Sequence, residues 1–164
     1  MVSDDRVVEL YEKAQQVPYA CLEDRDPGRL FETGRGSCLE KNAWLGERYE
    51  ELGIPVRYRL VEFDWRDLPL PEEVLELRDD YTGEHLVLEI ERGGEWLTVD
   101  ASWDPGLEDA GFPVTGDWDG RSDTGVAVEP LDSRELDGNP GSMHVEGSEF
   151  FDALNDYLED VRDS

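Results

Sequence analysis

A glycine-rich turn that leads into a helix beginning with a cysteine is the feature that most restricts how this chain folds. Residues 34–37 read Gly-Arg-Gly-Ser, and Cys38 follows them. Apolar residues then recur at helical spacing as far as about Leu52, where Gly53 and a nearby proline end the pattern. Backbone amides at a helix N-terminus lack partners and favour a thiolate over a thiol. The sequence therefore predicts a helix that presents a reactive cysteine in its first turn.

Two later segments have the pattern of neighbouring antiparallel strands. His85 lies near the start of the first, residues 83–90, and Asp100 ends the second, residues 95–100. The Gly-Gly pair at 93–94 is a typical hairpin turn. Counted outward from that pair, His85 is nine positions back and Asp100 is seven positions forward. The two side chains are therefore expected close together, about one pleat out of register.

A cysteine, a histidine and an aspartate are the nucleophile, the base and the orienting acid of thiol acyl-transfer chemistry. We therefore predict Cys38, His85 and Asp100 as the catalytic residues. No cofactor is predicted. No metal is predicted either, because the two cysteines and two histidines of the chain have no short ligand spacing. Cys21, the second cysteine, is expected to be a structural or incidental thiol. His144, the second histidine, is expected to lie in a surface loop.

Lysine is scarce in this chain, and one of its two lysines lies close to the predicted nucleophile. Lys41 follows Cys38 by three residues, which puts both side chains on one helix face. Two roles are open at this point. The ammonium group either favours the thiolate of Cys38 or pairs with a nearby acid.

The rest of the chain supplies further helices and strands around this centre. Amphipathic helices are expected behind Ser3 and Ser148, because serine is a good N-cap and an apolar face follows each. Strands are expected over 56–63 and 126–128. Residues 104–125 are expected to form an ordered loop packed over the sheet, because they retain apolar side chains that a solvated linker would not.

The order of these elements indicates a mixed fold. An opening helix, then the cysteine helix, then antiparallel strands is the order of an α+β protein, with the cysteine helix packed on an antiparallel sheet. The chain has 164 residues, no internal repeat and no linker-like stretch. We therefore predict a single domain over residues 1–164.

The chain is strongly acidic, and this limits its partners. It has 42 acidic against 15 basic residues and a net charge of −27. Self-repulsion of this size opposes compaction in ordinary salt, whereas in molar salt screening acts over only a few ångströms. The composition therefore favours a halophilic protein, with a dedicated basic partner as the alternative. Nucleic-acid binding is excluded, because phosphates would meet a negative surface.

The sequence gives no sign of export or membrane insertion. No apolar run is long enough to span a bilayer, and residues 1–5 lack the basic and hydrophobic stretches of a leader. We therefore expect a cytoplasmic protein with no membrane partner. In that compartment Cys21 and Cys38 are expected to be reduced thiols.

Taken together, these residues resemble the core of the transglutaminase-like cysteine proteins, which have a papain-like fold. The similarity covers roughly residues 34–120. It consists of Gly-Ser-Cys38 opening a helix, His85 beginning a strand, and Trp-Leu-Thr-Val-Asp100 ending the next, followed by Ala-Ser-Trp-Asp. In that superfamily the cysteine attacks an acyl carbon, the histidine is the base and the aspartate orients the histidine. By resemblance those roles fall on Cys38, His85 and Asp100.

A second resemblance is to the arylamine N-acetyltransferases, which carry an Arg-Gly-Gly-x-Cys-x-Glu-x-Asn pattern. Residues 35–42 match its Arg, Cys, Glu and Asn, with Cys38 one place nearer the glycine. The chain is far shorter than those enzymes, shows no phosphate site and is acidic, which opposes coenzyme A binding. Acetyl transfer of this kind is therefore the alternative activity.

The sequence thus predicts a thiol acyl-transfer enzyme that acts on a peptide, amide or amine substrate through a thioester. Water or an amine resolves the thioester. The backbone amide of Cys38 is expected to hold the oxyanion, with a second donor from residues 18–33. The rival from another class is a non-catalytic binding or scaffold protein on the same fold. A sulfur atom out of reach of His85, with no open cleft, would favour that rival.

Overall fold

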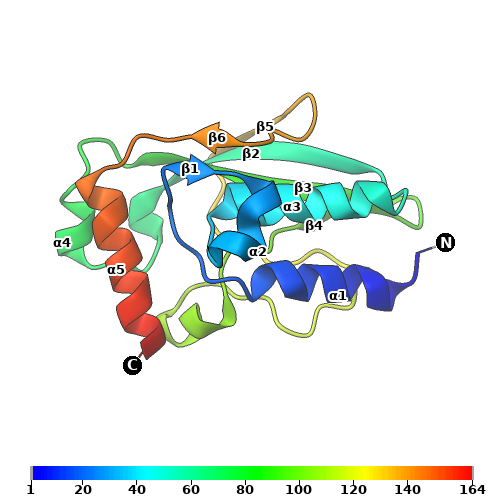
Figure 1. Cartoon of the computed structure of the whole chain (residues 1–164), viewed down its shortest axis with the longest axis horizontal. Helices are drawn as coiled ribbons and strands as arrows, with labels where there is room; N and C mark the ends of the chain where they lie inside the picture. Colours follow the sequence, from blue (N-terminus) through cyan, green and yellow to red (C-terminus); the bar gives the residue numbers. More distant parts are fainter. Residues whose placement is uncertain (1, 164) are drawn as a thin grey trace.

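The computed structural model describes residues 2–163 and has the mixed α+β composition expected from the order of the sequence patterns. Its helices and antiparallel strands are interspersed along the chain (Figure 1), and short 3-10 turns, η1 to η3, lie between them. In order, the elements are α1 (Asp4–Gln15), β1 (Asp24–Arg25), η1 (Pro27–Arg29), α2 (Leu30–Thr33), α3 (Cys38–Glu51), β2 (Val56–Asp64), η2 (Trp65–Asp67), α4 (Glu72–Leu75), β3 (Thr82–Arg92), β4 (Glu95–Val99), η3 (Pro105–Ala110), β5 (Asp132–Glu135), β6 (Met143–His144) and α5 (Glu149–Asp163).

Four of the strands form one antiparallel sheet in the order β4-β3-β2-β5, and β1 pairs with β6 in a separate two-stranded ribbon. The β3–β4 hairpin turns at Gly93-Gly94, and its register pairs Leu88 with Val99. Continuing that register, Asp100 follows β4 diagonally across from His85, two positions away from the residue directly opposite. The hairpin count made from the sequence therefore matches the observed strand pairing.

Helix α3 packs on β2 and β3, and α1 packs beside α3 (Figure 1). The approach of α3 to the sheet is close at Gly46, where an added Cβ atom would lie 2.5 Å from the Tyr58 hydroxyl. Leu45 and Tyr49 of the same helix are fully buried. One connected hydrophobic cluster joins α1, α3, the sheet and α5. The cysteine helix is thus held on the sheet as the order of the elements predicts.

Two of the expected helices begin where the serine caps predict. Ser3 accepts a hydrogen bond from the Arg6 amide at the start of α1, and Ser148 accepts one from the Phe151 amide at the start of α5. Helix α5 lies beside α4, at the end of the molecule away from the N-terminus (Figure 1). Its Arg162 forms a two-pronged ion pair with Asp104. That pair fixes α5 against the segment that follows β4.

The strand expected over residues 126–128 is wrong. These residues form no ladder, although Ala127 and Val128 are buried. Their apolar character reflects packing over the sheet, and the Ala127 amide donates to a side chain instead of to a strand. Residues 104–125, expected as an ordered loop, bury Leu107, Phe112 and Trp118.

Among the helices within residues 2–163, none combines the length and the apolar character needed to cross a lipid bilayer.

Candidate functional site

A capping box places Cys38 at the first residue of α3. The Ser37 hydroxyl accepts from the Leu39 amide at 3.3 Å, and the Glu40 carboxylate accepts from the Ser37 amide at 3.2 Å. The turn needs glycine at position 36, because an added Cβ atom would lie 2.9 Å from Leu30 and 3.0 Å from Glu40. These contacts engage the amides on either side of Cys38. The Cys38 amide, one of the first four of the helix, has no partner within the helix.

His85 and Asp100 form a buried pair beside this helix end. His85 Nε2 lies 2.7 Å from Asp100 Oδ2, and both side chains are almost completely excluded from solvent. Cys38 lies in the wall of the same cavity as His85, and it is among the groups that raise the pKa of this ring. Because Nε2 is engaged with Asp100, Nδ1 is the ring nitrogen left for Cys38. The structure thus brings the three predicted residues together around the imidazole.

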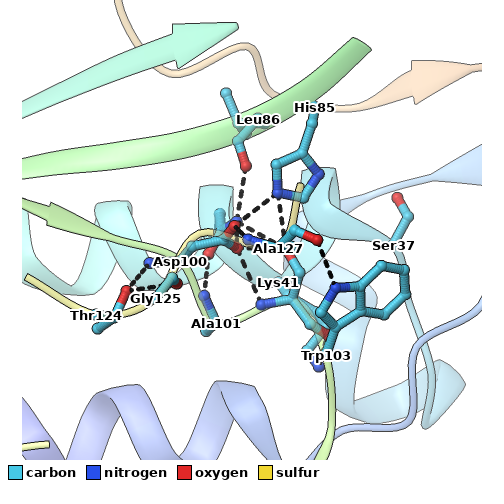
Figure 2. Close-up of polar contacts among 12 residues, drawn as sticks. Ser37, Lys41, His85, Leu86, Asp100, Ala101, Trp103, Thr124, Gly125 and Ala127 are labelled. Carbon is cyan, nitrogen blue, oxygen red and sulfur yellow. Dashed lines mark hydrogen bonds and ion pairs between the residues drawn. The ribbon is translucent and has the colours of Figure 1, made fainter. Parts of the chain in front are cut away.

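The Asp100 carboxylate is fully hydrogen-bonded (Figure 2). Its Oδ2 atom also accepts from the Ala127 amide at 2.9 Å. Its Oδ1 atom accepts from Asn42 Nδ2 at 3.0 Å and from both the amide and the hydroxyl of Ser102. Its own backbone amide donates to Thr124 at 2.9 Å. A carboxylate with this many donors is locked in orientation and favoured as the anion.

These contacts shift the protonation of both members of the pair. Burial works against the charged imidazole, but the Asp100 carboxylate and the Cys38 sulfur outweigh it and raise the pKa of His85 well above its usual range. Burial likewise opposes the Asp100 anion, but His85 together with the Ser102 and Ala127 donors lowers the pKa of Asp100. An imidazolium facing a carboxylate on one side and a sulfur on the other is therefore the favoured state.

Asn42 is a functional residue that reasoning from spacing missed. Its side-chain NH2 donates to Leu86 O at 2.8 Å as well as to Asp100, while its Oδ1 atom accepts from the Ala101 amide at 2.9 Å. One amide group thereby links α3 to β3 and to the segment after β4. The match of residues 35–42 to the acetyltransferase pattern already contained this asparagine, and that was the available signal.

Of the two roles that its spacing left open for Lys41, the ion pair with an acid does not occur among the described residues, whereas an electrostatic interaction with Cys38 does. Its fully buried Nζ atom donates to three backbone carbonyls, those of Gln15, Val17 and Ser102, at 3.0, 2.7 and 2.6 Å. It makes no ion pair with a described acid. Burial lowers its pKa to about 7, against the pull of Asp104 and Asp100. Lys41 is therefore a tie between three chain segments beneath the site.

An open cavity of about 460 Å³ gives access to the candidate site. Cys38 and His85 lie in its wall, together with Tyr19 and Cys21 from the segment before α3 and Phe151 from α5. The Cys21 thiol contacts the Tyr19 hydroxyl at 3.9 Å, and burial raises the pKa of Cys21 to about 12. Both cysteines are free thiols. The segment from which we expected an oxyanion donor therefore does reach the cavity.

His144 lies away from this cavity, on the exposed strand β6, where its ring pairs with Asp24 at 2.8 Å. Within residues 2–163 no cluster of three or more histidine, cysteine or carboxylate side chains is arranged to hold a metal ion.

Comparison with known proteins identifies no relative: no protein-family model matches the chain, and no curated protein matches it.

Proposed function

We propose that this protein is a cysteine-dependent acyl-transfer enzyme on a transglutaminase-like, papain-type fold. The observation that carries the proposal is the convergence of Cys38 and Asp100 on the buried ring of His85, at the wall of an open cavity. A Cys38 sulfur out of reach of His85, in a structure with no open cleft, would have favoured a scaffold protein. The observed arrangement has the opposite features and so supports an enzyme.

In the proposed reaction His85 already holds the proton taken from Cys38 as an imidazolium, and the sulfur attacks the carbonyl carbon of an amide substrate. The carbonyl oxygen becomes the oxyanion of a tetrahedral intermediate. The carbon–nitrogen bond then breaks, and His85 returns the proton to the leaving amine. Water or a second amine attacks the resulting thioester while the now neutral His85 accepts its proton, and the carbon–sulfur bond breaks to release the acyl product and regenerate Cys38. Asp100 holds the ring so that the same nitrogen faces the sulfur throughout.

Two groups are suited to stabilise the oxyanion. The first is the Cys38 amide at the N-terminus of α3. The second is the hydroxyl of Tyr19, which shares the cavity with Cys38. Burial raises the pKa of Tyr19 and keeps this hydroxyl protonated as a donor. We assign Tyr19 as the second donor that residues 18–33 were expected to supply.

Labelling with acyl-enzyme probes in molar salt tests the proposal. A panel of amide, peptide and thioester electrophiles is offered to the wild type, Cys38→Ala and Cys21→Ala, and the modified peptide is located by mass spectrometry. The wild type and Cys21→Ala are expected to label at Cys38, and Cys38→Ala is expected not to label. Cys21→Ala is the matched control, because it removes the neighbouring buried thiol. Equal labelling of Cys21 and Cys38, or none in the wild type, would overturn the proposal.

A further inference from the structure

The arginines of this chain divide into two unequal groups. The 15 basic residues include two lysines, so thirteen are arginines. Eleven of these form an ion pair with a carboxylate: Arg6, Arg29, Arg35, Arg48, Arg57, Arg59, Arg66, Arg92, Arg121, Arg134 and Arg162. For Arg25 and Arg78, no ion pair to a carboxylate occurs within the part of the chain that the structure describes. In a protein with 42 acidic residues, two arginines without a carboxylate partner call for an explanation.

Both exceptions line the cavity that contains Cys38 and His85. The Arg25 guanidinium donates from Nε to Leu22 O at 2.8 Å and lies over the Phe151 ring, while its Nη2 atom is buried without a partner. The Arg78 guanidinium donates from Nε to Asp80 O at 2.6 Å and lies over the Phe150 ring. Backbone carbonyls and aromatic faces hold these two cations in place without an ion pair, although Asp80 acts on Arg78 through its charge.

The two arginines act on the groups next to the candidate nucleophile. Arg25 lowers the pKa of Cys21 against the larger effect of burial, and Cys38 acts on the same thiol in the opposite sense. Arg78 also interacts electrostatically with Cys21. Cys21 therefore interacts with both arginines and with Cys38 in the wall of the same cavity.

Carboxylates are also present on the cavity wall, and they lie where water reaches them. Glu62, Asp80 and Glu84 are exposed, whereas Arg25 and Arg78 are partly buried. Glu84 is paired with Arg134, and Asp80 accepts from the Thr82 amide. Water and salt screen the charges of the exposed acids, whereas the charges of the partly buried arginines are screened less.

We propose that Arg25 and Arg78 bind a carboxylate carried by the acyl donor, so that the substrates are small amides or esters whose acyl group bears a negative charge. This inference rests on the proposed function, because it assigns the substrate class of the same site. Arginine suits the task, since its planar fork matches a carboxylate with two parallel hydrogen bonds. The carboxylate is bound but unchanged while the Cys38–carbon bond forms and the bond from that carbon to the leaving nitrogen, or to the leaving oxygen of an ester, breaks.

Alkylation by iodoacetate and by iodoacetamide tests this inference without knowledge of the substrate. The two reagents deliver similar small groups to a thiol, and only iodoacetate carries a carboxylate. The measured quantity is the ratio of their rates at Cys38 in molar potassium chloride, divided by the same ratio for free cysteine. We expect this normalised ratio to favour iodoacetate by about tenfold in the wild type. We expect Arg25→Gln combined with Arg78→Gln to bring the ratio close to that of free cysteine.

Matched variants separate charge from folding. Arg29→Gln removes an exposed, ion-paired arginine outside this cavity and is expected to leave the ratio unchanged. Arg25→Lys combined with Arg78→Lys keeps both charges and is expected to retain part of the preference. Circular dichroism of each variant checks that the fold is intact.

The outcomes distinguish this inference from the proposed function. Rapid alkylation of Cys38 by iodoacetamide with no preference for iodoacetate would overturn the anion site and leave the acyl-transfer proposal standing. No reaction of Cys38 with either reagent would overturn both. Protection of Cys38 from iodoacetamide by succinate supports a carboxylate site. Stronger protection by inorganic phosphate than by succinate would overturn the assignment to carboxylate.

Discussion

The molecule contains two histidine–aspartate pairs of nearly the same length in opposite surroundings. His85 and Asp100 are 2.7 Å apart, with side chains 3% and 0% exposed. His144 and Asp24 are 2.8 Å apart, with side chains 61% and 90% exposed. The first pair has Cys38, Ser102, Asn42 and the Ala127 amide around it. The second faces solvent. The comparison teaches that distance alone does not make a site, and that burial and additional partners do.

The largest expected difference between the pairs is in the reactivity of Cys38. His85→Gln removes the group that accepts the Cys38 proton, so alkylation by iodoacetamide near neutral pH is expected to slow by about 100-fold. His144→Gln is the control and is expected to change the rate less than about twofold, because its ring lies outside the cavity. Rates are measured by mass spectrometry of the Cys38 peptide. Equal effects of the two substitutions would refute a special role for His85.

The next difference is in stability. In Asp100→Asn, an NH2 group replaces one of the carboxylate oxygens that now accept hydrogen bonds, so one donor group faces another. His85 also loses its counter-charge. We expect the free energy of unfolding to fall by about 3–5 kcal/mol. Asp24→Asn breaks an exposed pair and is expected to leave the denaturation midpoint unchanged. Denaturant unfolding in molar salt measures both. A small change for Asp100→Asn would mean that its hydrogen-bond network contributes little to the fold.

The pH dependence of the pairs provides a finer comparison. The raised pKa of His85 contributes stability that is complete below the ordinary histidine value of about 6.5, and this stability is lost as the pH rises through the raised value. The lowered pKa of Asp100 contributes stability that is present above about pH 4 and lost as the pH falls. The pair therefore stabilises the fold most between these limits. NMR of the two rings is expected to show His144 losing its proton at lower pH than His85.

Cys38→Ala refines that measurement. The sulfur is one of the groups that raises the pKa of His85, so its removal is expected to lower this pKa and leave the titration of His144 unchanged. An unchanged His85 titration in Cys38→Ala would mean that the sulfur does not act on the ring.

The smallest expected effect is that of salt. The hydrogen bond that His144 donates to Asp24 raises the pKa of His144, and the charges of nearby acids add to the shift. At molar salt the screening length is about 3 Å, so the His144 titration is expected to move toward its ordinary value. The His85 titration is expected to move less, because its partner is buried with it. Titration of both rings over a range of salt concentrations measures this, and an equal shift of both would contradict the contrast in burial.

Local rules in the sequence were enough to place the helix starts and the hairpin. Serine caps and apolar spacing give the beginnings of α1 and α5, and the glycine-rich turn gives that of α3. The Gly93-Gly94 turn gives the register that brings His85 close to Asp100. Each of these depends on residues close together in the chain. The α+β class follows from their order.

The supporting contacts of the site could not be read in the same way. The Ala127 amide reaches Asp100 across 27 positions, and Asn42 reaches it across 58. Neither contact produces a repeating pattern in the sequence, because each is made by a single group of a single residue. The apolar run at 126–128 wrongly predicted a strand. A buried segment that pairs with no strand has the same local composition as a buried segment inside a sheet. Lys41 was ambiguous because its acceptors are backbone carbonyls, which every residue has.

Helix α5 closes the site from the far end of the described chain, and this has a consequence during synthesis. Its Asn155 binds both the amide and the carbonyl of Cys21, and its Phe151 lines the cavity. While α5 is still inside the ribosome, the nascent chain already carries Cys38, His85 and Asp100 but lacks that wall. Domains assemble as their segments emerge. The emergence of α5 therefore sets the moment at which a growing polypeptide acquires the last wall of its cavity, and the backbone of Cys21 gains its Asn155 partner only from then on.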